Sequence, residues 1–386
     1  MSTGKSILNF PFNTENMSND EFLNFIYDNI RNELEKQLPK SEKLHISNNF
    51  LIKKKKIHIP AYSILFFLEV HVDNKCVIEL ISKTKKSGGI DKYGEAVFNE
   101  KQTDRAKREY KLLEEVYGIF HGEPGLRVPT PVLFLEKLNT LIFSKAQGTD
   151  LGKYLNQWEF SMRLGKSSQK KISKIISLVA AWLKYFHHHF PLEAMEISKE
   201  ELVRKIIFDE EKINRWKYVP MEKVDYFKNQ ILKKGFPDKI KLPCSTLHGD
   251  FKYRHIWNNE DKFITVFDFG NQFEYNIIYE DLAGFLTETL LLNYGVNSSS
   301  FNKLPEIIEN AFLEKYDSRI DKNLLNLFMI RYLFKKWFKR RRRIYRYLNK
   351  TSNNIKLVNP IIKKGVEKYT DYFFIKNIEA KLNRIS

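Results

Sequence analysis

The chain has 386 residues, of which 42% are hydrophobic, 14% aromatic and 29% charged. This composition excludes collagen-like, low-complexity and disordered chains, and it supplies enough apolar side chains for a sizeable core. The formal net charge of +18 favours an anionic partner, which could be a phosphate-bearing substrate, a nucleic acid or an anionic membrane face.

Other classes of protein are excluded by features that the sequence lacks. No apolar run approaches the ~18–20 residues that span a bilayer, and no apolar segment with a small-residue cleavage site stands near the N-terminus. The two cysteines, Cys76 and Cys244, exclude a disulfide framework and a Cys-rich zinc site. We therefore expect a cytoplasmic protein with reduced thiols, either free in solution or peripheral at the inner face of a membrane.

The first predicted element is a helix that begins after Ser18. Ser18 and Glu21 have the spacing of a capping box, and apolar residues then recur at helical spacing until Pro39 ends the pattern. The run Lys53–Lys56 is expected to be a solvated turn.

Strand signals follow in two pairs. Ile64–Val72 and Cys76–Ser82 are rich in β-branched and aromatic residues and are separated by a turn-forming segment, which predicts a hairpin. A helix is predicted over Thr103–Tyr117. Val132–Glu136 and Thr140–Lys145 then form a second predicted hairpin.

From Leu151 onward the pattern is mostly helical. Gln169–His189 is amphipathic over its whole length, residues 198–233 are also predicted to be helical, and helices dominate again from Glu280. Strand signals return only in three short segments, Cys244–His248, Ile256-Trp257 and Phe263–Phe267. The sequence therefore predicts an α+β protein with a strand-rich part, residues 1–147, and a helix-rich part, residues 148–386.

One segment carries the pattern of a catalytic site. His248-Gly249-Asp250 is followed by His255, Asp268 stands thirteen residues after His255, and Asp281 stands thirteen residues after Asp268. Asp250 and Asp268 each lie at the end of a strand-like stretch. Phosphoryl transfer needs one carboxylate to orient an attacking hydroxyl and another to hold Mg²⁺, whose preferred ligands are oxygens.

This pattern resembles the aminoglycoside phosphotransferase and choline kinase family. The resemblance implies a bilobal protein-kinase-like fold, with a small antiparallel-sheet N-terminal lobe and a larger, mostly helical C-terminal lobe. It also implies that Asp250 is the catalytic base and Asp268 the metal ligand. His248 would brace the catalytic loop, and Asp281 would anchor that loop from the following helix.

The resemblance extends, with weaker motifs, to the first lobe. The family has a strand lysine that holds the nucleotide phosphates and pairs with a helix glutamate; Lys83, with Lys85 as the alternative, and Glu109 are the matching residues. The segment containing Ser144 resembles the inter-lobe segment that holds adenine. The implied cofactors are ATP or GTP together with Mg²⁺ or Mn²⁺.

Two departures from the family pattern leave alternatives open. His255 stands where the family usually has Asn, and an imidazole is a poorer Mg²⁺ ligand than an amide oxygen. His255 is a candidate metal ligand, which could bind the ion directly or through a water molecule. It could instead donate a hydrogen bond to Asp250 or to a phosphate, or it could brace the loop. The stretch Ile57–Ser63 contains no glycine, although a Gly-rich loop is expected there. A pseudokinase that binds nucleotide without turnover is therefore an alternative.

A basic segment lies near the C-terminus. Eight of the twelve residues 335–346 are Lys or Arg, and Trp337, Phe338 and Tyr345 stand among them. Such a helix could lie on an anionic membrane, bind a nucleic acid backbone, or pack on the core with a solvated basic face. A nucleic-acid-binding protein is therefore a second alternative. Of His187, His188 and His189, neighbours that point different ways on a helix, His187 is expected to pack in the core.

The function predicted from the sequence is ATP-dependent transfer of a phosphoryl group to a hydroxyl of a small molecule or glycan. The positive charge argues against cationic acceptors and favours a neutral or anionic acceptor such as a sugar or an envelope-type glycan.

Overall fold

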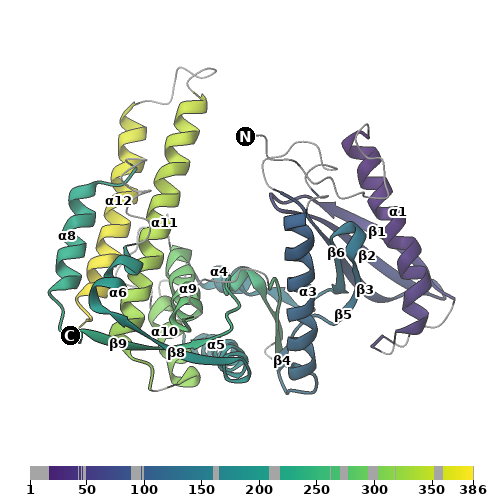
Figure 1. Cartoon of the computed structure of the whole chain (residues 1–386), viewed down its shortest axis with the longest axis horizontal. Coiled ribbons are helices and arrows are strands. Elements are labelled where there is room, and N and C mark those ends of the chain that lie inside the picture. The colour runs from purple at the N-terminus through teal and green to yellow at the C-terminus, as the bar shows by residue number, and fades with distance from the viewer. Residues whose placement is uncertain are drawn as a thin grey trace, which may run out of the picture. The chain divides into compact units, whose positions relative to one another are not determined.

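The computed structural model of the chain divides into two compact units, Met1–Thr149 with Trp257–Gly270, and Asp150–Ile256 with Asn271–Ser386 (Figure 1). The described residues are 17–41, 43–44, 46, 49–87, 97, 100–159, 165–207, 218–260, 262–269, 277–293, 303–317, 319–351 and 360–385.

The first unit is built on a five-stranded antiparallel sheet in the order β1-β2-β3-β6-β5. Alternate residues of β2, from Ile64 to Val70, are buried, as expected for a strand with one face on the core. The strands are β1 (Leu51–His58), β2 (Ser63–Val72), β3 (Lys75–Lys85), β5 (Pro131–Leu135) and β6 (Thr140–Ser144).

The predicted N-terminal helix is α1 (Asn19–Gln37), followed by the 3₁₀ turn η1 (Leu38–Lys40). Its capping box is formed, because the Glu21 amide donates to Ser18 Oγ at 3.3 Å and the Ser18 amide donates to Glu21 Oε2 at 2.8 Å. Apolar residues of α1 pack with β1, β2 and β3 in one core cluster. A second helix, α3 (Glu100–Phe120), packs on β3, β5 and β6 and carries Glu109.

The Lys53–Lys56 segment is not the solvated turn that we expected but the middle of strand β1. It forms the edge of the sheet, pairing with β2 alone in the strand order. Lysines are common on edge strands because their charge opposes pairing with another chain. The hairpin turn before β3 is at Asp73 and Asn74, both with positive φ, 49° and 62°, a conformation that Asp and Asn tolerate.

A second, smaller sheet explains why residues 257–270 group with the first unit. Its strands, in the order β4-β11-β10-β7, are β4 (Leu126–Arg127), β11 (Phe263–Val266), β10 (Ile256–Asn259) and β7 (Thr149–Asp150). Strand β11 pairs in parallel with β4, so Asp268 belongs with the first unit although the predicted division placed it in residues 148–386. Gly148 has a φ of 103°, and a Cβ there would lie 2.2 Å from the Asn258 carbonyl oxygen, a position that only glycine fits.

The second unit is mostly helical, with a hairpin of β8 (Pro191–Ser198) and β9 (Lys239–Ser245). Helices α8, α11 and α12 stand side by side in Figure 1, and the rings of Phe227, Phe334, Trp337 and Phe374 pack in sequence across them. The helices are α4 (Leu151–Glu159), α5 (Lys166–His189), α6 (Lys199–Ile206), α8 (Met221–Leu232), α9 (Tyr279–Leu290), α10 (Leu304–Tyr316), α11 (Lys322–Thr351) and α12 (Pro360–Leu382).

The predicted α+β class is confirmed, with the larger sheet in the first unit and most helices in the second. Short 3₁₀ turns complete the description: η2 (Glu136–Leu138), η3 (Tyr253–His255) and η4 (Leu291–Asn293). Among the residues that the structure describes, no helix combines the length and the apolar character needed to cross a bilayer.

Candidate active site

In the first unit, Lys83 lies in contact with two carboxylates from distant segments of the chain, Glu109 and Asp268. Lys83 Nζ donates to Glu109 Oε1 at 2.7 Å and also contacts Asp268 Oδ1. Burial alone would lower the pKa of Lys83, but the opposite charges of Asp268 and Glu109 outweigh it and raise the pKa. Lys83 is therefore a permanently charged ammonium held by two carboxylates.

Lys85, the alternative to Lys83, also reaches Glu109. Burial lowers the pKa of Lys85, and the attraction of Glu109 only partly offsets that effect. Lys83 contacts both carboxylates, Glu109 and Asp268, whereas the ion pair of Lys85 is with Glu109. The geometry therefore favours Lys83 as the lysine of this cluster.

Asp268 follows strand β11 and has an unusual backbone conformation. Its φ is 70°, in the left-handed region, which costs a non-glycine residue free energy; besides turns, residues in this conformation cluster at functional sites. The carboxylate is 36% exposed, so it is accessible to a ligand. An accessible carboxylate is a hard oxygen donor of the type that Mg²⁺ or Mn²⁺ takes, and Asp268 therefore fits a divalent ion.

In the second unit, Asp281 holds the His248-Gly249-Asp250 loop. It lies in the first turn of α9, is 2% exposed, and accepts hydrogen bonds from the His248 amide at 2.7 Å and the Gly249 amide at 2.9 Å. Gly249 has a φ of 81°, which glycine adopts without strain. One buried carboxylate thus determines the path of the loop that carries Asp250.

His187 contacts the carboxylate of Asp281. His187 Nε2 lies 3.3 Å from Asp281 Oδ2, and His187 Nδ1 lies 2.7 Å from the Tyr316 hydroxyl. The sequence predicted that His187 packs in the core, and it is buried, but its contact with Asp281 was not foreseen. The only signal was a polar residue on the apolar face of α5.

The side chains of the loop have distinct surroundings. The His248 ring is buried and lies edge-on to Trp182 and Phe251, with centroids 6.2 and 5.5 Å away. The Asp250 carboxylate is one-third exposed, and Lys252 Nζ lies 2.5 Å from its Oδ2. Sequence reasoning missed Lys252, although it stands inside the motif, because a lysine in a chain with so many lysines carries little information.

His255 lies against the loop itself. Its Nδ1 is 3.1 Å from the backbone carbonyl oxygen of Asp250 and 3.7 Å from Asp250 Oδ2. The first contact is that of a donor bracing the loop backbone. The predicted role of His255 as a metal ligand stays a prediction.

Ser144 lies on a cavity in the first unit. Its hydroxyl accepts from the Thr130 amide at 2.8 Å, and its own amide donates to the Thr130 carbonyl at 2.9 Å. The cavity has a volume of about 580 Å³, and its lining includes Glu79, Thr130, Ser144, Lys145 and Thr265. Lys83, Glu109 and Asp268 are not among its lining residues. The predicted contact between Ser144 and a nucleotide stays a prediction.

The comparisons with known proteins give similarities of structure alone. No family model and no curated protein matches the sequence. Among solved structures, the ternary complex of APH(2″)-IIa with streptomycin and ATP is 14% identical, with a TM-score of 0.47, over 83% of this chain and 94% of the other.

Two further solved structures have lower scores. ADP-bound aminoglycoside phosphotransferase APH(2″)-Ib is 12% identical, with a TM-score of 0.46, over 91% of this chain and 98% of the other. A putative fructosamine-3-kinase from Thermobifida fusca is 11% identical, with a TM-score of 0.41, over 78% of this chain and 91% of the other.

Proposed function

We propose that the protein is a phosphotransferase that moves the γ-phosphoryl group of ATP, or of GTP, to a hydroxyl of a small molecule or glycan, such as a neutral or anionic sugar. The observation that carries this proposal is the contact of Lys83 with both Glu109 and Asp268. The three residues come from a strand, a helix and a loop far apart in the sequence, and each matches a residue type that phosphoryl transfer requires.

The nucleotide would be held by the first unit. Lys83, kept charged by Glu109, would bind the phosphates as a positive point. Asp268 would hold Mg²⁺ or Mn²⁺, which supplies charge neutralisation at the phosphates when bound. The base is proposed to bind next to Ser144.

The acceptor would be activated by the second unit. Asp250 would orient the attacking hydroxyl and accept its proton, because its carboxylate is accessible and its loop is held by Asp281. Lys252 would position Asp250 through its contact with the carboxylate, and His255 through its contact with the backbone carbonyl of Asp250. Electrostatic stabilisation of this kind depends on groups that are fixed before the reaction begins.

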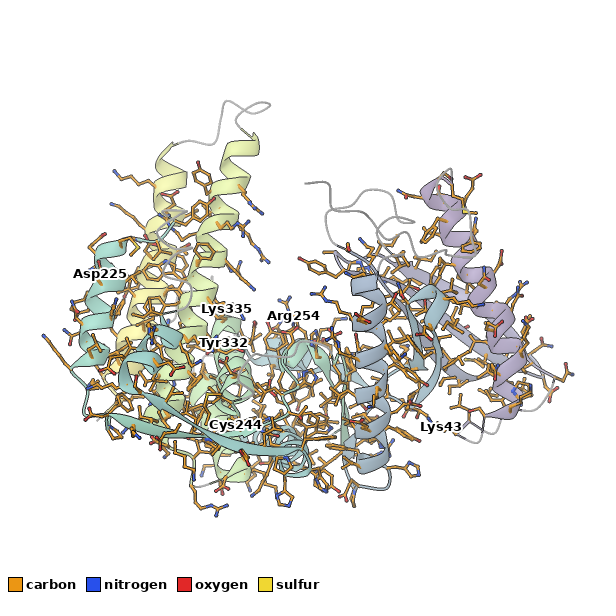
Figure 2. The ribbon with its side chains drawn as sticks, in the orientation of Figure 1. Lys43, Asp225, Cys244, Arg254, Tyr332 and Lys335 are labelled. Atoms are coloured by element: carbon orange, nitrogen blue, oxygen red, sulfur yellow. The ribbon has the colours of Figure 1, made fainter. Side chains whose placement is uncertain are left out.

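The substitution Asp250→Asn tests the assignment. It should lower kcat by a factor of about 10²–10⁴, the range for loss of a general base, while the affinity for nucleotide stays close to that of the parent. The matched control is Asp225→Asn, on the exposed side of α8 (Figure 2), which should not change kcat. Turnover is measured as nucleotide consumption over a panel of sugars. Wild-type kcat in Asp250→Asn would disprove the role of Asp250.

A further inference from the structure

Helix α11 has two chemically different faces. Leu333, Phe334 and Trp337 are buried, and the Trp337 indole donates to Asp371 of α12 at 2.8 Å. Tyr332, Lys335, Lys336 and Lys339 recur at intervals of three and four and so share another face. In Figure 2, Tyr332 and Lys335 lie one above the other along α11, and Arg254 is labelled on the same side of that helix.

Contacts between α11 and α9 fix the position of this basic face relative to the loop that carries Asp250. Arg331 pairs with Glu280 and Lys336 with Glu288, so two ion pairs join α11 to α9. The helices also approach closely, since a Cβ on Gly284 would lie 3.3 Å from the Tyr332 ring. Because α9 also carries Asp281, which holds the loop, the lysines of α11 have a defined position relative to Asp250.

The charges around Asp250 are predominantly positive. Lys335, Lys336 and Lys339 all interact electrostatically with Asp250 and Lys252. Burial, followed by repulsion from Lys339, lowers the pKa values of Lys335 and Lys336 to about 8. On the loop and the facing parts of α9 and α11, the cations Lys252, Arg254, Arg331, Lys335, Lys336 and Lys339 outnumber the carboxylates Asp250, Glu280, Asp281 and Glu288.

Such a cluster is costly for the protein by itself. Lys336 is paired with Glu288, and the Lys335 ammonium lies 5.2 Å from the centroid of the Tyr332 ring, but the three ammonium groups still repel one another, and Lys335 and Lys336 are partly buried. A bound anion would relieve that repulsion, and a lysine is a suitable point charge for a phosphate or a carboxylate.

We propose that Lys335 and Lys339 form a subsite for an anionic group, a phosphate or a carboxylate, carried by the acceptor whose hydroxyl Asp250 orients. This inference rests on the proposed phosphotransferase function and names its substrate class. The subsite positions the acceptor through its charge, so a cationic acceptor is repelled and a neutral one is bound weakly.

A labelling experiment tests the subsite without any turnover. The 386-residue chain is acetylated at pH 8 and constant ionic strength, and the labelling rates of Lys335 and Lys339 are read by peptide mass spectrometry. Inorganic phosphate, glucose 1-phosphate and glucuronate are compared with glucose. Glucose 1-phosphate and glucuronate should slow labelling several-fold, while glucose should not. Equal rates with all four compounds would overturn the proposal.

Variants sharpen the same measurement. In Lys339→Gln, Lys335 remains as the reporter, and the anion concentration needed for protection should rise about tenfold, as expected for loss of a charged hydrogen bond. The control is Lys364→Gln/Lys368→Gln, two exposed lysines on α12, which should leave protection unchanged. Protection that survives Lys339→Gln, or that is lost equally in the control, would overturn the proposal.

The arms of the test separate the sources of the anion. Protection by inorganic phosphate alone, and by neither sugar anion, would identify a free-ion site and overturn the acceptor subsite. Weaker binding of a fluorescent ATP analogue to Lys335→Gln/Lys339→Gln would mean that the lysines bind the nucleotide. Protection by phosphatidylglycerol vesicles, and by no sugar anion, would mean that they bind a membrane. Either result would overturn the proposal. If the sugar anions protect but no acceptor is phosphorylated, the subsite stands and the proposed function fails.

Discussion

At the scale of single residues, Asp281 has the largest structural task in the candidate site. It is almost fully buried and has three partners, the amides of His248 and Gly249 and the ring of His187. A buried charge is stable only when such partners surround it. In the proposed function, Asp281 would therefore be a positioning residue, which acts on the reaction through the loop.

The substitution Asp281→Asn should reduce both stability and turnover. An amide has one acceptor oxygen where the carboxylate has two, so one of the two loop amides is left without its partner. The expected cost is about 1–3 kcal/mol, measured by urea denaturation, with a fall in kcat larger than the change in nucleotide affinity. Asp225→Asn on α8 serves as the control. Unchanged kcat in a destabilised variant would mean that Asp281 serves the fold alone.

His255 can be tested by comparing two amides. In Asn the side-chain nitrogen occupies nearly the place of His Nδ1, the atom that lies 3.1 Å from the Asp250 carbonyl. His255→Asn should therefore retain activity to within about threefold, and His255→Leu should lose tenfold or more, the effect of one hydrogen bond. The ratio of activities with Mg²⁺ and Mn²⁺ should be the same in both variants. A changed ratio in His255→Asn would instead indicate a metal ligand.

At the scale of elements, the basic segment 335–346 of α11 contributes both to the face that packs on neighbouring residues and to the face that carries the lysines. Arg341 is part of the packing side: its Nε donates to the Tyr218 carbonyl at 2.9 Å and lies 3.4 Å from Asp371, and its Nη1 lies 3.3 Å from Glu367. Burial raises the pKa of Asp371, and the Trp337 indole and Arg341 oppose that rise. The basic run is therefore not uniformly a solvated face.

The arginines of α11 should consequently differ in their effect on stability. Arg341→Gln should lower the free energy of unfolding by about 1–3 kcal/mol, because it removes the donor to the Tyr218 carbonyl and the cation beside Glu367 and Asp371, and it leaves Asp371 with the Trp337 indole. Arg340→Gln, at an exposed position one residue away, should change it by less than about 0.5 kcal/mol. Urea denaturation followed by circular dichroism measures both. Equal effects at the two positions would contradict this division of the helix.

At the scale of the whole molecule, the residues proposed to bind the nucleotide and those proposed to act on the acceptor belong to different compact units. Lys83, Glu109 and Asp268 fall in the first, and His248, Asp250 and Asp281 in the second. The two sets should therefore respond separately to ligands, because a ligand stabilises the state that binds it.

Calorimetry with and without Mg²⁺ and ATP tests this separation. At a ligand concentration 100 times Kd, the stabilisation should be about 2.7 kcal/mol, seen as a rise in Tm. Asp268→Ala should lose this rise, whereas Asp250→Asn should keep it. If Asp250→Asn abolishes the rise and Asp268→Ala does not, the nucleotide is not held by the first unit as proposed.

The sequence by itself determined the α+β class, the capping box of α1, the hairpin before β3 and the positions of the His-Gly-Asp loop and its two later aspartates. These features are local, since each follows from residue spacing and from the preferences of turns, caps and strands. The same local reasoning misjudged Lys53–Lys56, because an exposed edge strand and a solvated turn both favour lysine.

Only the tertiary structure decided which residues meet. It distinguished Lys83, which contacts Asp268, from Lys85, and it placed His187 in contact with Asp281. It also separated Arg341, which packs toward α12, from the lysines of α11 near Asp250. His187 and Asp281 are 94 positions apart in the sequence, and Lys83 and Asp268 are 185 positions apart. Local spacing carries no information about such contacts, because they depend on how helices and strands pack together.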